Sequence, residues 1–386
     1  MSQKKARTIA FYLPQFHPTP ENDYYWGKGF TEWTNVAKSK PLFRGHQQPR
    51  IPADLGFYDL RLPQAREAQA ELAKEAGIEG FCYWHYWFGN GKETLTMPLD
   101  EVVRLGKPDF PFCVCWANHD WTTKTWEKGK SLSKNSIIFK QEYLGQEDYT
   151  KFFYRLLSAF KDKRYIKVDG KLLFLIYNAE TFENIQEFFS VWHELAKKEG
   201  LNDFYFVAYA VTVPHIRAID TFKVARETDN IVNNQLDKIL SLGFSGVTVS
   251  NIKYAEIKAH HIIYKIIYGG TKRVFPELLL QKYDYKKIIK NFYPDFCRRE
   301  DVYPQIIAGW DRSPRSGRKA VIYCHDTPEN FGEGVKKALS CVENRDPEHR
   351  LIFLNSWNEW GEGSYMEPDL RYGKGKLETL KQILEN

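Results

Sequence analysis

The stretch LIFLNSWNEWGEG, residues 351–363, begins as an apolar run and ends in a polar cluster. Its first part, residues 351–357, has the composition of a buried β-strand, because it is rich in apolar residues and carries no charge. Two carboxylates, Glu359 and Glu362, follow three residues apart, beside Trp357 and Trp360. Carboxylates among tryptophans are poorly solvated, so they are uncommon without a partner or a function. The stretch therefore predicts a buried strand that gives way to a reactive loop.

Seven further apolar runs precede it and also lack a polar face, as parallel strands buried on both sides do. They cover residues 8–13, 80–85, 112–117, 172–177, 204–210, 246–250 and 305–310. Most are followed by helical patterns. These patterns cover residues 63–77, 147–162, 184–200, 233–243, 332–344 and 375–386. Eight strand–helix units predict an α/β fold, a (β/α)8 TIM barrel with long βα loops.

An open doubly wound sheet is the alternative fold for such an alternation of strands and helices. Sheets of that kind that bind dinucleotides carry a Gly-rich phosphate loop after the first strand. Here LPQFHP, residues 13–18, stands at that point instead. The barrel is therefore favoured.

The composition is typical of a folded globular protein. The chain has 386 residues, of which 43% are hydrophobic and 16% aromatic. That length suffices for one large domain or two ordinary ones. Aromatic faces suit the C–H faces of sugar rings, although we expect most of these rings to pack in the core.

The net charge of +6 comes from one segment of the chain. Residues 253–300 hold 11 Lys and Arg against 5 Asp and Glu, and the charges of the remaining chain balance. We expect a basic insertion with a solvated charged face, because charge runs are usually that. The interleaved Ile and Tyr residues also allow peripheral contact with an anionic membrane or binding to an acidic polymer. No nucleic-acid-binding motif accompanies them, so nucleic acid is not an expected partner.

Cysteine spacing and hydropathy bear on the cellular compartment. The six cysteines show no CxxC spacing, so no disulfide framework or zinc pattern is predicted. No run of about 20 apolar residues exists that could span a membrane. The N-terminal sequence MSQKKARTIAFYL has too short an apolar run for a signal peptide. We expect a cytoplasmic protein, with peripheral association at the inner membrane as an alternative.

Metal and cofactor signatures are missing from the sequence. His17 and His85 are candidate ligands, yet neither HExxH nor HxxEH spacing occurs. A DxD signature for a metal–nucleotide complex is also missing, which weighs against a sugar-nucleotide transferase. We therefore expect no metal and no cofactor.

The active site of such a barrel lies at the carboxyl ends of its strands. Polar and aromatic residues gather at these ends and are expected to bind substrate. The candidates are Tyr12, Gln15, His17, His85, Tyr86, Trp116, Asn118, Tyr177, Tyr209, Trp310, Asp311, Asn355, Trp357, Asn358 and Trp360. The long loop after the first strand adds Trp33 and His46, because long loops in compact domains are usually functional. Packing over the barrel is an equal alternative for Trp33.

The carboxylate pair has a specific chemical use. Two neighbouring carboxyl groups push their pKa values apart, so one stays protonated while the other is ionised. This gives the acid and the base that cleavage of a glycosidic bond requires. Gly361 and Gly363 are expected to let the backbone approach a ligand closely. A single Glu would more often cap a helix or pair with an Arg, but the cluster favours Glu359 and Glu362 as catalytic residues.

Several long motifs resemble glycoside hydrolase family 99-like proteins, and more closely the WbsX-type branch found with bacterial surface-polysaccharide genes. The resemblance covers the chain from about residue 8 to 373. The motifs are AFYLPQFHP (10–18), the segment from NDYYWGKGF to FYDLR (22–61), GIEGFCYWHYWF (77–88), FPFCVCWAN (110–118), RYIKVDGKLLFLIY (164–177) and NSWNEWGEGSYMEPD (355–369).

This resemblance implies a barrel that acts on α-linked glycans such as mannosides, as oligo- or polysaccharides, without a metal. The family's E-W-x-E motif carries two catalytic glutamates and here reads Glu359-Trp360-Gly361-Glu362. By that match Glu359 would remove the proton from the sugar 2-hydroxyl, and its oxygen would attack C1 to form a 1,2-anhydro sugar. Glu362 would protonate the leaving oxygen and then activate water, giving net retention. One catalytic domain over residues 1–386 is implied, with the basic insertion at 253–300 inside it.

Three functions remain open from the sequence. The first is a retaining, endo-acting glycoside hydrolase that uses the glutamate pair. The second is a glycosyltransferase or transglycosylase of lipopolysaccharide or capsule biosynthesis, because the branch has also been labelled glycosyltransferase. The third is a glycan-binding barrel without catalytic activity, against which the intact glutamate pair argues.

Overall fold

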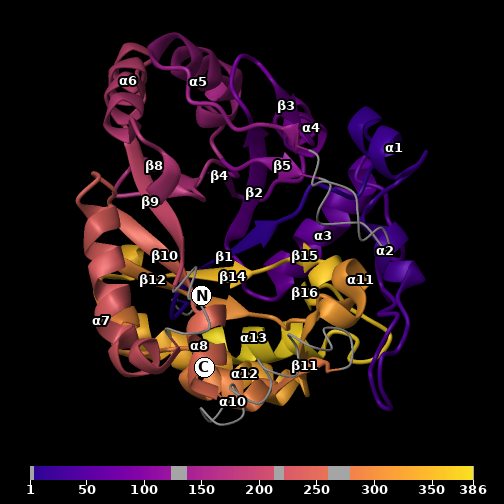
Figure 1. Ribbon diagram of the computed structural model, residues 1–386. Coiled ribbons are helices and arrows are strands. Elements are labelled where there is room, and N and C mark those ends of the chain that lie inside the picture. The colour runs from indigo at the N-terminus through magenta and orange to yellow at the C-terminus, as the bar shows by residue number, and fades with distance from the viewer. Residues whose placement is uncertain (1–3, 123–136, 213–220, 260–278, 386) are drawn as a thin grey trace.

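Eight parallel strands close into a barrel in the computed structural model, which describes residues 4–122, 137–212, 221–259 and 279–385. The barrel strands are β1 (Arg7–Tyr12), β2 (Gly80–Trp87), β4 (Phe112–Trp116), β8 (Lys171–Ile176), β9 (Phe204–Val211), β10 (Gly246–Ser250), β12 (Val302–Ile307) and β14 (Leu351–Asn355). Each pairs with the next of these along the chain, and β14 pairs with β1. The expected (β/α)8 TIM barrel is therefore confirmed (Figure 1).

Seven of the eight expected strands agree with the observed ones to within two residues at either end. The exception is β12, which begins and ends three residues before the expected 305–310. Pro304 lies inside this strand, opposite Val249 of β10, although proline usually marks a strand end because it donates no ladder hydrogen bond. Trp310 and Asp311 therefore follow the strand as part of a loop.

Helices follow most of the barrel strands, as the pattern predicts. The expected ones are α3 (Pro63–Glu75), α5 (Gln146–Phe160), α6 (Ile185–Lys198), α7 (Thr221–Leu240), α12 (Pro328–Val342) and α13 (Gly375–Glu385). Helix α7 begins before the expected residue 233. The sequence pattern did not show the early part of this helix because, of its described residues before 233, only Thr228 and Val232 are buried. The other α-helices are α1 (Pro20–Trp26), α2 (Glu32–Lys38), α4 (Met97–Leu105), α8 (Ile252–Ala259), α10 (Tyr285–Asn291) and α11 (Ser313–Ser316).

Short strands decorate the loops at the ends of the barrel. Strand β3 extends β2 as a hairpin, β7 pairs with β8, and β11 pairs with β13 outside the barrel. Their bounds are β3 (Glu93–Thr94), β5 (Trp121–Thr122), β6 (Ile137–Phe139), β7 (Lys167–Val168), β11 (Gln281–Asp284), β13 (Val321–Cys324), β15 (Asn358–Glu359) and β16 (Ser364–Tyr365).

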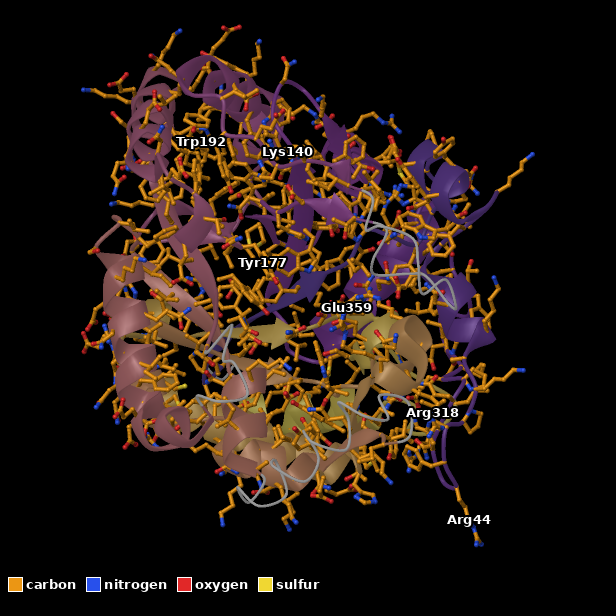
Figure 2. All side chains as sticks on the ribbon, viewed as in Figure 1. Arg44, Lys140, Tyr177, Trp192, Arg318 and Glu359 are labelled. Atoms are coloured by element: carbon orange, nitrogen blue, oxygen red, sulfur yellow. The ribbon has the colours of Figure 1, made fainter. Side chains whose placement is uncertain are left out.

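An aromatic core joins α5 and α6 to β8 and β9. Trp192 of α6 is fully buried, and its ring lies 4.8 Å from Phe174 and 5.1 Å from Phe204, measured between centroids. Its indole N–H donates to the carbonyl oxygen of Tyr149 at 3.0 Å. In Figure 2, Trp192 lies toward the top of the molecule, and Tyr177 and Glu359 lie near its centre. Many aromatic residues thus serve packing, as expected.

The described part of the basic segment 253–300 packs against the barrel. Tyr285, Ile288 and Phe292 of α10 and its C-terminal end are buried in a cluster with Ile252 and Tyr323. These apolar side chains are therefore not available for contact with a membrane. Residues 260–278 lie outside the described residues, so the basic insertion at 253–300 stays a prediction, as does the single domain over residues 1–386. No helix in the described ranges is both long and apolar enough to cross a membrane.

The core analysis predicts the effect of removing the Trp192 ring. Trp192→Ala should lower the free energy of unfolding by about 3–5 kcal/mol, because it leaves a cavity and an unpaired carbonyl. Tyr24→Ala is the control, since Tyr24 is 82% exposed, and should change stability by less than about 0.5 kcal/mol. Urea denaturation followed by circular dichroism measures both. Equal stability of the two variants would contradict the assigned core.

Candidate active site

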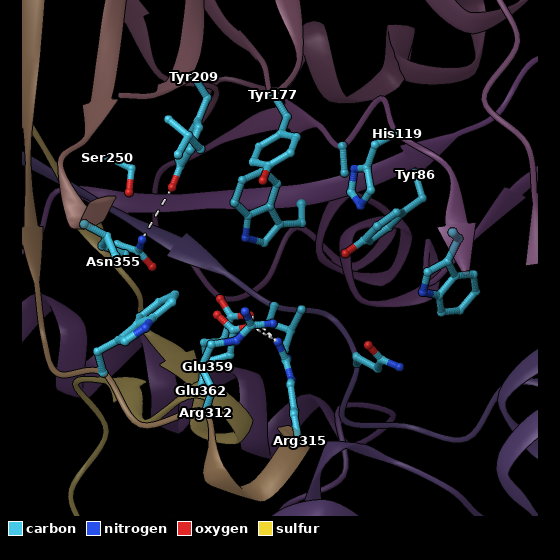
Figure 3. A pocket seen from close by; sticks show the side chains of 18 of the residues that line it. Tyr86, His119, Tyr177, Tyr209, Ser250, Arg312, Arg315, Asn355, Glu359 and Glu362 are labelled. Carbon is cyan, nitrogen blue, oxygen red and sulfur yellow. Dashed lines mark hydrogen bonds and ion pairs between the residues drawn. The ribbon is translucent and has the colours of Figure 1, made fainter. Parts of the chain in front are cut away.

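A cavity of about 390 Å³ lies at the carboxyl ends of the barrel strands (Figure 3). Strand ends and the loops after them supply its wall, because the parallel strands all end on this side. The lining residues are Leu13, Gln15, Trp84, Tyr86, Ala117, His119, Trp121, Tyr177, Tyr209, Val211, Ser250, Ile252, Lys253, Trp310, Arg312, Arg315, Asn355, Glu359 and Glu362.

Glu359 and Glu362 enter the cavity from one short turn after β14. Glu359 ends β15, and Glu362 ends the 3-10 helix η7 (Trp360–Glu362). Their side chains are 16% and 12% exposed. Arg315 Nη1 donates to Oε1 of Glu359 at 3.1 Å and to Oε1 of Glu362 at 2.6 Å. Arg312 Nε lies 3.1 Å from the same Glu362 oxygen, so Glu362 contacts two guanidinium groups and Glu359 only one.

The two carboxyl groups differ in acidity. Burial raises the pKa of Glu359 to about 7, and the neighbouring charge of Glu362 adds to the rise. Burial also acts to raise the pKa of Glu362, but Arg312 and Arg315 together lower it below its usual value. In the free protein Glu362 is therefore the ionised member of the pair, and Glu359 is the member that holds a proton below about pH 7. This order is the reverse of the roles that the family resemblance implies.

A third carboxylate stands behind the pair. Glu32 is the first residue of α2, in the long loop after β1, and its side chain is fully buried. Its Oε1 accepts from Arg315 Nε at 3.1 Å. Sequence reasoning missed Glu32, Arg312 and Arg315, because nothing in their local patterns connects residues that lie some 280 positions apart.

The two glycines of the motif have a different use from the one expected. A Cβ atom on Gly361 would overlap Oε1 of Glu32 and lie 2.9 Å from Nε of Arg315. A Cβ on Gly363 would lie 2.8 Å from Cβ of Asp311. The backbone is bare here so that protein side chains can approach, and the expectation of a close ligand contact is corrected.

Aromatic rings form the wall opposite the glutamates, as Figure 3 shows for Tyr86, Tyr177 and Tyr209. The rings of Trp84 and Tyr177 lie 5.5 Å apart between centroids, and those of Tyr177 and Tyr209 lie 5.0 Å apart. Asn355 Nδ2 donates to the Tyr209 hydroxyl at 3.5 Å. Rings with hydroxyl and amide groups beside them suit the C–H faces and hydroxyl edges of sugars.

The structure brings part of the predicted binding set to the cavity. Besides the two glutamates, the residues that line it are Gln15, Tyr86, Tyr177, Tyr209, Trp310 and Asn355. Lining residues outside the predicted set include Trp84 in β2, and His119 and Trp121, which follow β4. In β2, Trp84 and Tyr86 line the cavity, whereas His85 between them faces the helices, so the predicted binding residues included one of the wrong face and omitted one of the right face. Successive strand residues face opposite sides, and sequence alone does not give the phase.

Three predicted binding residues on strands face the helices and not the cavity. The Tyr12 hydroxyl donates to Gln69 of α3 at 2.7 Å. His85 stacks on Phe152 of α5, and burial lowers its pKa to about 3. The Trp116 indole is fully buried and donates to the Trp87 carbonyl at 2.8 Å. These placements correct the expectation that they line the cleft.

Other predicted residues after strand ends build the framework around the site. Asn358 is fully buried and bonds to both backbone groups of Leu13, and Trp357 packs against Phe81. The Trp360 indole donates to Glu367 at 2.6 Å. Buried polar groups need such partners, which is why these side chains turn inward. None of them lies among the described lining residues.

The remaining predicted binding residues also lie outside the cavity lining. Asn118 Nδ2 donates to the Tyr143 hydroxyl and the Asn178 carbonyl, both at 2.9 Å, and His17 is buried. His46 and Asp311 contact each other, with 2.9 Å between the imidazole and the carboxylate, and neither lines the cavity. The Trp33 indole donates to the Tyr58 carbonyl at 2.8 Å, which is the packing alternative. Within the described ranges, no group of three or more His, Cys, Asp and Glu side chains could hold a metal ion.

Solved structures of similar fold include two glycoside hydrolase-type proteins. A "glycoside hydrolase-like protein" aligns over 100% of this chain and 96% of its own, with a TM-score of 0.60 and 13% identity. The GH99 endo-alpha-mannosidase from Bacteroides thetaiotaomicron aligns over 98% of this chain and 95% of its own, with a TM-score of 0.52 and 13% identity. At these identities the similarity establishes the fold alone.

Relatives and a family model match the sequence itself. Two proteins described as "uncharacterized protein WxcX", from two strains of Xanthomonas campestris pv. campestris, are 31% identical over 380 residues, or 98% of this chain. The chain spans about half the length of these curated relatives, 50% in each. The family model described as "Glycosyltransferase WbsX" matches residues 8–380. The chain therefore belongs to the WbsX glycosyltransferase family.

Proposed function

We propose that this chain cleaves α-linked glycosidic bonds with retention of configuration, and that Glu359 and Glu362 are its catalytic pair. The observation that carries the proposal is the pair itself: two carboxyl groups of unequal acidity in one aromatic-walled cavity of a barrel. Glycosidic cleavage needs one carboxyl group that donates a proton and one that accepts a proton. The barrel belongs to a glycan-related family, which adds support.

The position of the pair favours attack by the substrate's own hydroxyl. Both glutamates come from a single turn, whereas retaining enzymes with a protein nucleophile hold carboxyl groups about 5–5.5 Å apart on either side of the bond. Among the described lining residues these two are the only carboxylates, so none of those residues offers a third from the opposite face. A 2-hydroxyl trans to the leaving group, as in α-mannosides, can attack C1 directly.

The charges of the free protein suggest how the proton moves. The Glu362 carboxylate takes the proton of the 2-hydroxyl as that oxygen bonds to C1, and Glu359 gives its proton to the leaving oxygen as the C1–O bond breaks. A 1,2-anhydro sugar results. A water molecule then attacks C1 and gives a proton to Glu359, while Glu362 returns its proton to O2. Two inversions at C1 give retention. The two roles are exchanged relative to those that the resemblance implies.

An oligo- or polysaccharide is the proposed substrate, and endo action the proposed mode. Six aromatic side chains line the cavity, which is more than one sugar ring contacts at a time. The described rings that surround the pair therefore support binding of several consecutive sugars.

Transfer to an acceptor sugar is the second candidate, and the family's description as a glycosyltransferase favours it. It uses the same pair and the same 1,2-anhydro sugar. A hydroxyl of the acceptor takes the place of water in the second step, and Glu359 accepts its proton. Hydrolysis and transfer therefore differ only in what reaches C1.

Replacement of each glutamate by glutamine tests the pair and its roles. Both Glu359→Gln and Glu362→Gln should lower turnover of α-mannosidic oligosaccharides by about 100-fold or more. On a glycosyl fluoride, whose leaving group needs no proton, Glu359→Gln should still release fluoride in the first turnover, and Glu362→Gln should not. Product analysis by mass spectrometry and fluoride release measure this.

Glu333→Gln is the matched control, because Glu333 is exposed on α12, and it should leave turnover unchanged. The reverse pattern on the fluoride would restore the roles implied by the resemblance. Full activity of both site variants would exclude the pair.

The pH dependence of kcat/KM follows from the same charges. Because the pKa of Glu359 is raised to about 7, its proton is present below that pH and lost above it, so the rate should fall through about pH 7. Because the pKa of Glu362 is lowered, the acid limb should lie below the usual glutamate pKa of about 4.3. Initial rates between pH 3.5 and 9 at low substrate, about half a unit apart, measure both limbs. A rate that still rises at pH 8 would contradict Glu359 as the acid.

Competition between water and acceptor decides between hydrolysis and transfer. With added mannose oligosaccharide as acceptor, a transferase should give longer products that retain the α-configuration, and a hydrolase should give new reducing ends. Nuclear magnetic resonance of the anomeric protons identifies linkage and configuration. Products of inverted configuration would exclude the 1,2-anhydro route for both.

A further inference from the structure

We propose that Glu32 is a positioning residue of this site, whose buried carboxylate acts through Arg315 to keep one proton on the Glu359–Glu362 pair. The inference rests on the proposed function for its catalytic meaning, since a resident proton matters only if the pair works as acid and base. The arrangement of charges that carries it is independent of any substrate.

One guanidinium group joins the three carboxyl groups. Arg315 lies on α11, in the loop after β12, and its side chain is 6% exposed. Its Nε donates to Glu32 at 3.1 Å, while Nη1 donates to Glu359 at 3.1 Å and to Glu362 at 2.6 Å. The positive charge of Arg315 is therefore shared by these three carboxyl groups at least. The interaction of Arg315 with Glu32 weakens its effect on the pair.

The count of charges then requires one proton. Among the residues that the structure describes, three carboxyl groups meet two guanidinium groups, those of Arg312 and Arg315. If every group were ionised, the cluster would hold a net charge of −1 largely out of water, which is costly. Glu362 has both guanidinium groups beside it and a 2.6 Å bond from Arg315, whereas Glu32 and Glu359 each accept from Arg315 at 3.1 Å. Burial raises the pKa of Glu32 as well as that of Glu359, but Arg315 counteracts the rise more than Glu362 adds to it at Glu32, and the reverse holds at Glu359. Glu359 also lines the cavity, so we place the proton there.

The other titratable groups of the cavity wall do not disturb this balance near neutral pH. Burial raises the pKa values of Tyr86, Tyr177 and Tyr209, so these hydroxyls stay neutral. Burial lowers the pKa of His119, so its imidazole is neutral too. Lys253 is charged, but its ammonium group lies 2.9 Å from Glu256.

Further charged groups lie on the other side of the glutamate turn. The backbone N–H of Asp311 donates to the Glu362 carbonyl at 2.6 Å. Its carboxylate turns away to His46, at 2.9 Å, and has Arg50 within 4.0 Å. Arg50 pairs with Asp326 at 3.0 Å, and the ammonium group of Lys376 lies 3.3 Å from the same Asp326 oxygen. Two carboxylates and two cations therefore balance here, apart from the cluster of three carboxyl groups.

Gly361 links Glu32 to the catalytic motif independently. The position between the two glutamates has no side chain, and the space that a Cβ would fill is occupied by Glu32 Oε1 and Arg315 Nε. Glu32 is therefore fitted to the turn that carries the pair and does not merely face it. Any side chain at this position would push the Glu32–Arg315 contact away.

Carboxyl titration of the protein itself tests the inference without a substrate. Protein labelled with 13C at the glutamate side-chain carboxyl is titrated by NMR, and Glu32→Gln, Glu359→Gln and Glu362→Gln assign the three signals. At neutral pH Glu359 should hold a proton while Glu32 and Glu362 are ionised. Glu32→Gln should move the Glu359 midpoint to lower pH by about one unit, because Arg315 then serves the pair alone. Glu32→Asp, which keeps the charge, should move it less.

Glu79→Gln is the matched control, because it removes a carboxylate 2.7 Å from Arg7 at the opposite end of the barrel, and should leave the midpoint unchanged. A proton on Glu32 in the wild type, or an unmoved Glu359 midpoint in Glu32→Gln, would overturn the inference. If Glu32→Gln does not fold, the wild-type titration, with the other two variants for assignment, still decides which group holds the proton. The expected titration in a protein inactive on glycans would overturn the proposed function alone.

Discussion

Burial of three carboxylates around the buried guanidinium group of Arg315, with the partly exposed Arg312 beside them, is the constraint around which the carboxyl end of this barrel is built. The groups come from three strands that neighbour one another in the barrel: Glu32 follows β1, Arg312 and Arg315 follow β12, and the glutamate pair follows β14. Since each ion would be costly alone, the three loops stabilise one another only when all are in place. The long loop after β1 therefore completes the ion cluster and does more than cover the barrel.

The cavity is divided into a charged side and an aromatic side. The loops after β12 and β14 supply the charged groups of the cavity wall, and Tyr86 of β2, Tyr177 at the end of β8 and Tyr209 of β9 face them (Figure 3). A sugar ring between them would meet flat apolar surface on one side and proton-transferring groups on the other. In the proposed reaction this division would hold the anomeric carbon near the carboxyl groups, with the rings positioning the sugar and the charged groups transferring protons.

The sequence predicts local features of this protein well and long-range pairings poorly. Eight apolar runs predict the barrel because buried parallel strands need no polar face, and Pro304 shifts one boundary because a proline is tolerated inside β12. The glutamate pair is visible because both residues lie in one short motif. Glu32 and Arg315 are not, because their contact depends on β1 and β12 both neighbouring β14. His85 and Trp116 were assigned to the wrong side because strand phase is not in the sequence.

Charge balance also explains how one site could serve hydrolysis or transfer. In the proposed first step Glu359 loses a proton as Glu362 gains one, and the second step returns both. The sum of charges over the buried cluster is therefore the same before, between and after the steps, so neither step creates a net charge away from water. Water and an acceptor hydroxyl both deliver one proton to Glu359, and the cluster does not distinguish them. Selection between the two would then depend on groups outside this cluster that bind an acceptor sugar, for which the aromatic side of the cavity is suited.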